Sequence, residues 1–142
     1  MALYCRRAEK KDIPALALAE KACFPHDFWS ENALLSHFES AAGGAFVIEK
    51  DGALCAYLLV SVIPPEGEVL RIAALPPFRR QGYARRLLAF FLDTVSLCFL
   101  EVRESNTPAR SLYEALGFTL SGHRPRYYQN PTEDACLYKK IL

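Results

Sequence analysis

The chain has 142 residues, a formal net charge of +1 and 51 % hydrophobic residues. This length suits one domain with its own core, and we expect residues 1–142 to form it. The hydrophobic content excludes a disordered chain. The near-neutral charge excludes a protein that binds nucleic acid through a strongly basic surface, so no direct nucleic-acid partner is expected.

The first third of the sequence predicts one strand and two helices. The strand is expected from Leu3 to Arg6, and Asp12 is placed to cap a helix that continues to about Cys23. An aromatic-rich loop, FPHDFWS, follows, and its Ser30 is expected to cap a second helix.

Three β-rich runs and a helix are predicted in the middle of the chain. AFVIEK and ALCAYLLVSVI are joined at Asp51-Gly52, a dipeptide typical of hairpins, and EVLRIAAL is the third run. After the basic segment FRRQGYARR, apolar residues at helical spacing predict a helix whose buried face extends to Val95.

The last third predicts a strand, a short helix and two closing strands. SLCFLEV is the strand, Asn106 lies at the helix start, and Gly117 is expected to stop the helix. GFTLSGH and DACLYKKIL read as the closing strands, with HRPRYYQNPTE as a loop between them. The whole order, β α α β β β α β α β β, predicts one compact α/β unit around a mixed sheet.

The distribution of cysteines and histidines predicts neither a disulfide framework nor a metal site. The five cysteines are widely spaced without a Cys-x-x-Cys pair, and the three histidines are scattered. The first residues lack the long apolar run of a signal peptide, and no run is long enough to span a bilayer. We therefore expect a reducing, cytoplasmic setting and no membrane partner.

A basic, glycine-containing segment lies between the third β-rich run and the helix that follows. It consists of Arg79, Arg80, Gln81, Gly82, Tyr83, Ala84 and Arg85. A helix N-terminus offers unpaired N–H groups and a partial positive charge, which together suit a pyrophosphate. A surface turn with solvated arginines is the alternative, since the pattern is common by chance. The position between a strand and a helix favours phosphate binding.

The same segment resembles the cofactor-binding motif of the GNAT acetyltransferases, Q/R-x-x-G-x-G/A. Arg79, Gly82 and Ala84 fill its fixed places. The resemblance implies the GNAT fold, an α/β (α+β) arrangement in which about four helices flank a mixed, mostly antiparallel sheet of six to seven strands. It also implies acetyl-CoA as the cosubstrate, no metal, and main-chain contacts to the pantetheine arm from Ile72, Ala73 and Ala74.

LEVRESNTPARSLYEALGF is similar to a stretch of the RimI-type N-terminal acetyltransferases, with Leu-Glu-Val-Arg, Ser-Asn and Leu-Tyr-Glu-x-Leu-Gly-Phe in the same order and spacing. The resemblance makes Glu101 the general base, Tyr113 the general acid and Asn106 a coenzyme A contact. A solvated carboxylate, a core aromatic and a helix cap are the structural alternatives for these three residues. The interval from Ala84 to Glu101 is shorter than in the family, which implies a shorter helix or a tighter turn.

Two further segments, FPHDFWSENAL and PRYYQNPTEDA, resemble the acceptor side of the same enzymes. They place Phe24, Trp29, Tyr127 and Tyr128 around a peptide slot, with core packing as the alternative. An N-terminal α-amine has a pKa of about 7.7–8.0, against about 10.4 for lysine, so more of it is neutral at physiological pH. This makes a protein N-terminus a plausible acceptor, and the resemblance implies the N-terminal alanine of a small-subunit ribosomal protein.

Other functions stay open at this point. One alternative is a GNAT enzyme that acts on a lysine side chain or a small amine, and another is a coenzyme A-binding module without turnover. Glu101 and Tyr113, both in place, argue against the second alternative. Cys98 lies in an apolar run, where a thiolate forms poorly, so we expect direct transfer in a ternary complex. A monomer or weak dimer is expected.

Overall fold

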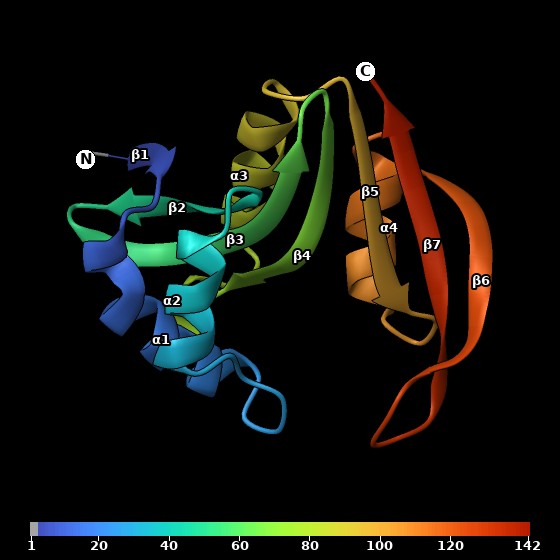
Figure 1. Cartoon of the computed structure of the whole chain (residues 1–142), viewed down its shortest axis with the longest axis horizontal. Coiled ribbons are helices and arrows are strands. Elements are labelled where there is room, and N and C mark those ends of the chain that lie inside the picture. Colours follow the sequence, from blue (N-terminus) through green and yellow to red (C-terminus); the bar gives the residue numbers. More distant parts are fainter. Residues whose placement is uncertain (1–2) are drawn as a thin grey trace.

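The computed structural model describes residues 3–142 and contains one mixed sheet of seven strands (Figure 1). Its order is β1-β2-β3-β4-β5-β7-β6, and all neighbours are antiparallel except β4 and β5. The strands are β1 (Leu3–Arg7), β2 (Gly43–Lys50), β3 (Ala53–Ile63), β4 (Glu66–Ala74), β5 (Leu97–Arg103), β6 (Thr119–Tyr128) and β7 (Glu133–Ile141). The helices are α1 (Ile13–Cys23), α2 (Glu31–Glu39), α3 (Tyr83–Leu92) and α4 (Thr107–Ala115), with 3₁₀ helices η1 (Lys10–Asp12) and η2 (Pro76–Phe78). The predicted order of elements is confirmed.

Local signals explain several of the element boundaries. The Oγ of Ser30 accepts the N–H of Ala33, which confirms the predicted cap of α2. Asp51 and Gly52, with φ of 52° and 83°, form the predicted hairpin turn between β2 and β3. Asp12 precedes α1, but its side chain makes no cap bond to that helix. The predicted cap was wrong because Arg6 binds both carboxylate oxygens of Asp12, at 2.8 and 2.9 Å.

Two predicted boundaries differ from the structure. The segment 123–133 is not a loop throughout, because β6 continues to Tyr128. β6 is an edge strand, where a proline lacking its N–H is tolerated, so Pro125 does not end it. The register with β7 shifts between Arg124 and Tyr128. At the other boundary, α3 ends at Leu92, so Val95 lies in the connection to β5 and packs on the core from there.

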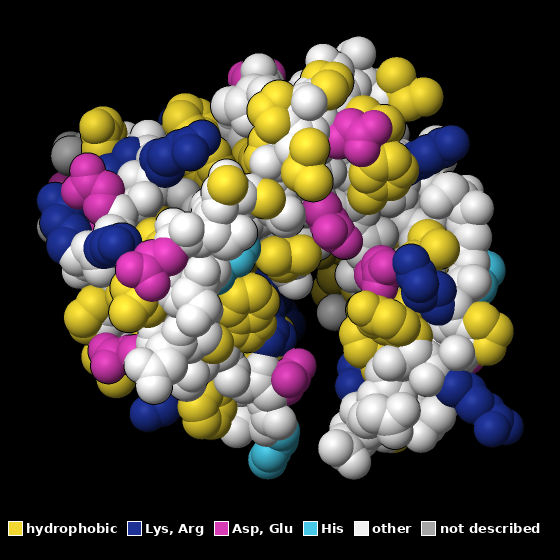
Figure 2. Space-filling view, viewed as in Figure 1, with side chains coloured by type: hydrophobic (Ala, Val, Ile, Leu, Met, Phe, Trp, Pro, Cys, Tyr) yellow, Lys and Arg dark blue, Asp and Glu magenta, His cyan; other side chains and the backbone are white. Residues whose placement is uncertain are grey.

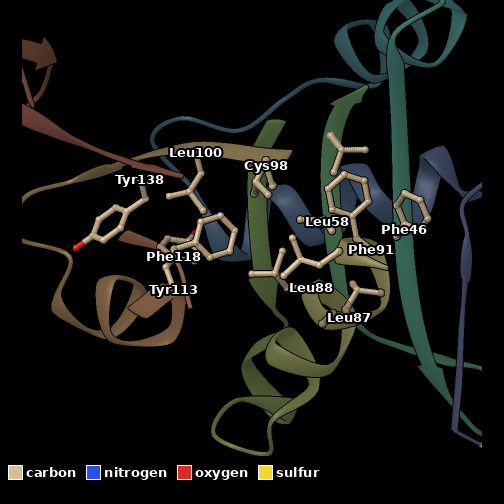
Figure 3. Close-up of a cluster of buried hydrophobic side chains, with 14 of the residues drawn as sticks. Phe46, Leu58, Leu87, Leu88, Phe91, Cys98, Leu100, Tyr113, Phe118 and Tyr138 are labelled. Atoms are coloured by element: carbon tan, nitrogen blue, oxygen red, sulfur yellow. The ribbon is translucent and has the colours of Figure 1, made fainter. Parts of the chain in front are cut away.

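Helices cover both faces of the sheet, which gives two apolar layers. α1 and α2 lie over β2 to β4 on one face, and α3 and α4 lie on the other (Figure 1). The larger layer joins Phe91 and Leu88 of α3 to Tyr113 of α4 beneath Cys98 and Leu100 of β5 (Figure 3). Within residues 3–142, no helix is long and apolar enough to cross a membrane.

The sheet opens at its centre, between β4 and β5, which form the one parallel pair among residues 3–142. β4 and β5 pair from Glu66 opposite Leu97 to Val69 opposite Leu100, and beyond these pairs the strands diverge (Figure 1). On the other side of β4, the register with β3 shifts so that Leu70 has no opposite residue. Such a bulge frees backbone groups from the ladder, so the ends of β4 and β5 can bind other molecules.

Candidate active site

A cavity of about 850 Å³ opens where β4 and β5 diverge. The loop after α1 forms one wall of the cavity, and the turn between β6 and β7 forms the opposite wall. Figure 2 shows the notch between these two parts of the surface. The four aromatic residues predicted to frame the acceptor all line it: Phe24, Trp29, Tyr127 and Tyr128. Segments about one hundred positions apart in the sequence thus face each other across one opening.

Glu101 is the first residue of β5 beyond its pairing with β4, and it lines the cavity. Its side chain is 19 % exposed, and its Oε1 lies 3.1 Å from Nε of Arg124 on β6. A hydrogen bond to Glu101 raises the pKa of Tyr127. On β4, burial and the charge of Glu101 raise the pKa of Glu68. The carboxylate is therefore held by polar neighbours and still reaches the cavity, as a proton acceptor must.

Tyr113 on α4 combines a buried ring with a hydroxyl at the cavity wall. The residue is 5 % exposed, and its ring centroid lies 5.8 Å from that of Phe118 and 6.2 Å from that of Tyr138. Its hydroxyl has no hydrogen-bond partner among residues 3–142, and the residue lines the cavity. Burial raises the pKa of Tyr113, so the hydroxyl is protonated at neutral pH. The same residue can pack the core and donate a proton.

Asn106 caps α4 and lies at the edge of the same cavity. Its Oδ1 accepts the N–H of Ala109 at 3.2 Å, which fits the helix-cap alternative. The side-chain amide nitrogen has no acceptor within the described residues, so it can bind another molecule while the cap is kept.

The N-terminus of α3 has no side-chain cap, in contrast to those of α2 and α4. Gly82 is its N-cap residue, with φ of 80°, and a Cβ built there would meet nothing within 4 Å. Four exposed arginines surround this helix start and form no ion pair with any of residues 3–142: Arg79, Arg80, Arg85 and Arg86. Open N–H groups, positive charge and free space together suit an anion such as a pyrophosphate.

The predicted pantetheine strand connects this helix start to the cavity. Ile72 lines the cavity, whereas Ala73 packs toward α1 and α2. The Nε of Arg79 donates to the carbonyl oxygen of Ala74 at 3.3 Å, which ties the basic segment to the end of β4. The basic segment itself does not line the cavity. The helix start that suits a pyrophosphate and the cavity that contains Glu101 are therefore separate, as expected for binding a long coenzyme.

The described residues form no cluster of metal ligands and contain no cysteine with the properties of a nucleophile. Residues 3–142 contain no group of three or more His, Cys, Asp or Glu side chains that could hold a metal ion. All five cysteines are free thiols. Burial raises the pKa of Cys98 to about 12, so this thiol stays protonated and cannot serve as a nucleophile at neutral pH.

Sequence reasoning missed three charged residues beside the cavity. Arg124 pairs with Glu101, and Arg71 lines the wall next to Phe24. Glu20 is fully buried beneath the loop after α1. One signal was available, because Glu20 follows Leu16 by four positions and so lies on the apolar face of α1.

Comparison with known proteins identifies the family. The sequence profile of the acetyltransferase (GNAT) family matches residues 13–118. The [ribosomal protein bS18]-alanine N-acetyltransferase of Escherichia coli K12 is 35 % identical over 132 residues, covering 89 % of this chain and 86 % of that protein. A putative enzyme of the same name from Bacillus subtilis is 30 % identical over 140 residues, covering 93 % of this chain and 91 % of that protein.

A solved structure agrees with these relatives. The crystal structure of the ribosomal-protein-S18-alanine N-acetyltransferase from Escherichia coli matches with a TM-score of 0.90 and 30 % identity, covering 99 % of this chain and 94 % of that one. The chain therefore belongs to the GNAT family of acetyltransferases. It is an acetyl-CoA-dependent N-acetyltransferase, and its predicted resemblance to the RimI-type enzymes is confirmed.

Proposed function

We propose that this enzyme transfers an acetyl group from acetyl-CoA to the N-terminal α-amine of a protein, and that its acceptor is the N-terminal alanine of ribosomal protein bS18. The observation that carries the proposal is the cavity itself, where Glu101 lies between two aromatic walls at the divergence of β4 and β5. The relatives' names support the acceptor. Residues 1–142 act as one domain, in the cytoplasm, as a monomer or weak dimer.

The cofactor site in this proposal extends from the start of α3 to the end of β4. The N–H groups from Gly82 onward receive the pyrophosphate, and the surrounding arginines add positive charge. The backbone of Ile72, Ala73 and Ala74 holds the pantetheine arm, and the free amide nitrogen of Asn106 adds a contact. Acetyl-CoA supplies an activated thioester at the end of this path.

Glu101 and Tyr113 divide the proton transfers. Glu101 takes a proton from the ammonium form of the α-amine, and the neutral nitrogen then forms the new C–N bond with the acetyl carbon. A backbone N–H freed at the Leu70 bulge steadies the negative charge that develops on the acetyl oxygen. Tyr113 gives its proton to the sulfur as the C–S bond breaks, and the second proton lost by the nitrogen restores the Tyr113 hydroxyl. Transfer is direct in a ternary complex, and no residue of the chain is acetylated.

Replacing Tyr113 by phenylalanine tests the acid role, because it removes only the hydroxyl from a ring that packs the core. We expect turnover to fall by about 100-fold, the lower range for general acid catalysis, with unchanged acetyl-CoA affinity in calorimetry. Tyr4→Phe is the control, since Tyr4 is an exposed residue of β1 outside the cavity. Full turnover in Tyr113→Phe would remove the acid role.

The two aromatic walls define which acceptors fit. An extended chain can place its first residue between Trp29 and Tyr128 and leave by the open side, so a free N-terminus with a small first side chain is favoured. A lysine inside a chain carries backbone on both sides of its Cα, and that backbone would clash with the walls when the side-chain amine reaches Glu101. Such a slot gains binding energy from the peptide, which a small amine cannot supply.

A comparison of peptide and small amine tests this function. A hexapeptide that begins with alanine should be acetylated with a kcat/KM at least about 100-fold higher than that of a small diamine, because the aromatic walls act only on the peptide. The measurement is initial rates of coenzyme A release at several acceptor concentrations. Equal or better use of the diamine would support the small-amine alternative and reject the N-terminal function.

A further inference from the structure

A fully buried carboxylate, Glu20, lies in the last turn of α1 and is the one buried charged side chain among residues 3–142. Its Oε2 accepts a hydrogen bond from the hydroxyl of Tyr57 on β3. Burial and this carboxylate raise the pKa of Tyr57, so the hydroxyl keeps its proton and remains the donor. A buried carboxylate is costly unless it is paired, so it requires a cation nearby.

Arg71 on β4 supplies the cation. Its Nη2 lies 3.5 Å from Oε1 of Glu20, and its side chain is only 13 % exposed. The guanidinium carbon lies 3.9 Å from the ring centroid of Phe24. Its Nε is buried without a hydrogen-bond partner among residues 3–142. An unsatisfied buried N–H is unfavourable, so the remaining contacts of Arg71 must offset this cost.

Glu20 and Arg71 both contact the loop between α1 and α2, residues 24–30. Oε1 of Glu20 accepts the N–H of Trp29 at 2.9 Å. Nη2 of Arg71 donates to the carbonyl oxygen of Asp27 at 2.5 Å, and its guanidinium stacks on Phe24. The loop is thus held at its start, middle and end. Its residues Phe24, Asp27 and Trp29 form one wall of the cavity.

We propose that Glu20 and Arg71 are positioning residues that hold the 24–30 loop as the acceptor wall, and so set the affinity for the acceptor peptide but not for acetyl-CoA. This inference rests on the proposed acetylation of a peptide N-terminus. If the loop is correctly placed only part of the time, the apparent acceptor affinity falls in proportion. The proposed phosphate site at the start of α3 is not part of this network.

The test uses the double variant Glu20→Gln/Arg71→Met, which removes both charges together. Removing Arg71 alone would leave the carboxylate buried and unpaired, and the protein could fail to fold. We expect the KM for a peptide beginning with alanine to rise about ten-fold, as for a loop that is competent one-tenth of the time. The Kd of acetyl-CoA, measured by calorimetry, should not change. Arg71→Lys keeps the charge without the planar stacking and should give a smaller rise in KM.

The loop also contains a residue whose fluorescence reports on its exposure to solvent. The chain contains one tryptophan, Trp29, so intrinsic tryptophan fluorescence reports on this loop alone. Quenching by acrylamide should increase in the double variant, because the loop is no longer tethered. This readout needs no acceptor. If the wild-type protein acetylates no peptide, the proposed function fails, and the Trp29 quenching still decides whether Glu20 and Arg71 hold the loop.

A control is Arg6→Met/Asp12→Asn, which removes the partly buried ion pairs of Arg6 with Asp12 and Glu49, with N–O distances of 2.8 and 2.6 Å, from a place outside the cavity. This variant should lose stability but keep the peptide KM and the Trp29 quenching of the wild type. The inference is overturned if the folded Glu20→Gln/Arg71→Met variant keeps the wild-type peptide KM and quenching. A parallel rise in the acetyl-CoA Kd would also overturn it, because the network would then support the whole of β4.

Discussion

Replacing Glu101 by glutamine is expected to lower turnover at neutral pH by about 100-fold or more, the range for losing a general base. Glutamine has nearly the same shape and can still contact Arg124, so the fold and the cavity should persist. It cannot take a proton. The acceptor amine must then arrive already neutral, and at neutral pH most α-amines carry a proton. Acetyl-CoA affinity should stay unchanged in calorimetry.

The pH profile separates loss of a base from loss of structure. An α-amine has a pKa of about 8, so a rise in pH neutralises the acceptor without help from the enzyme. Turnover of Glu101→Gln should therefore rise steeply between neutral pH and about pH 9 and recover part of the deficit. Glu104→Gln, an exposed carboxylate three positions away, is the control and should keep the wild-type profile. A Glu101→Gln variant with full turnover at neutral pH would exclude the base role.

Replacing Gly82 by valine should weaken acetyl-CoA binding by about 100-fold, an effect of about 2.7 kcal/mol. Gly82 has φ of 80°, a conformation that a β-branched residue rarely adopts, so the start of α3 must shift. The side chain would also enter the open space beside the helix N-terminus, where the pyrophosphate is proposed to lie. Calorimetric titration with coenzyme A measures the change.

Gly52 offers a closely matched control. It has φ of 83° in the hairpin between β2 and β3, and a Cβ there also meets nothing within 4 Å. Gly52→Val should therefore cost a similar backbone strain, of about 1–2 kcal/mol in unfolding free energy, and leave coenzyme affinity unchanged. Equal affinity losses in the two variants, or a folded Gly82→Val with wild-type affinity, would exclude the phosphate site at α3.

The arrangement of elements was predictable because most boundaries carry local signals. Asp51-Gly52 predicted the hairpin, and Ser30 predicted the start of α2. The local signals gave wrong predictions where a residue binds a partner that is distant in the sequence. Asp12 binds Arg6 and not the helix that it precedes. Pro125 resembles a loop residue, but the pairing of β6 with β7 carries the strand past it.

The proposed catalytic residues and the hidden network differ in how the sequence shows them. Glu101 and Tyr113 lie in one continuous stretch with the family's spacing, so resemblance was enough to select them. Glu20 and Tyr57 are 37 positions apart and meet only because α1 packs on β3. Arg124 reaches Glu101 across β7, which lies between β5 and β6. Such pairs cannot be predicted from the sequence, because the residues become neighbours only in the folded sheet.

Two peptides of the same sequence distinguish acetylation of an N-terminus from acetylation of a lysine. One begins with a free alanine and has its lysine blocked, and the other has a blocked N-terminus and a free lysine. With saturating acetyl-CoA, kcat/KM is measured for each, and mass spectrometry locates the acetyl group. We expect the free N-terminus to be acetylated with a kcat/KM at least about 100-fold higher, given the lower pKa of the α-amine and the narrow slot. Preferential acetylation of the lysine would contradict the account.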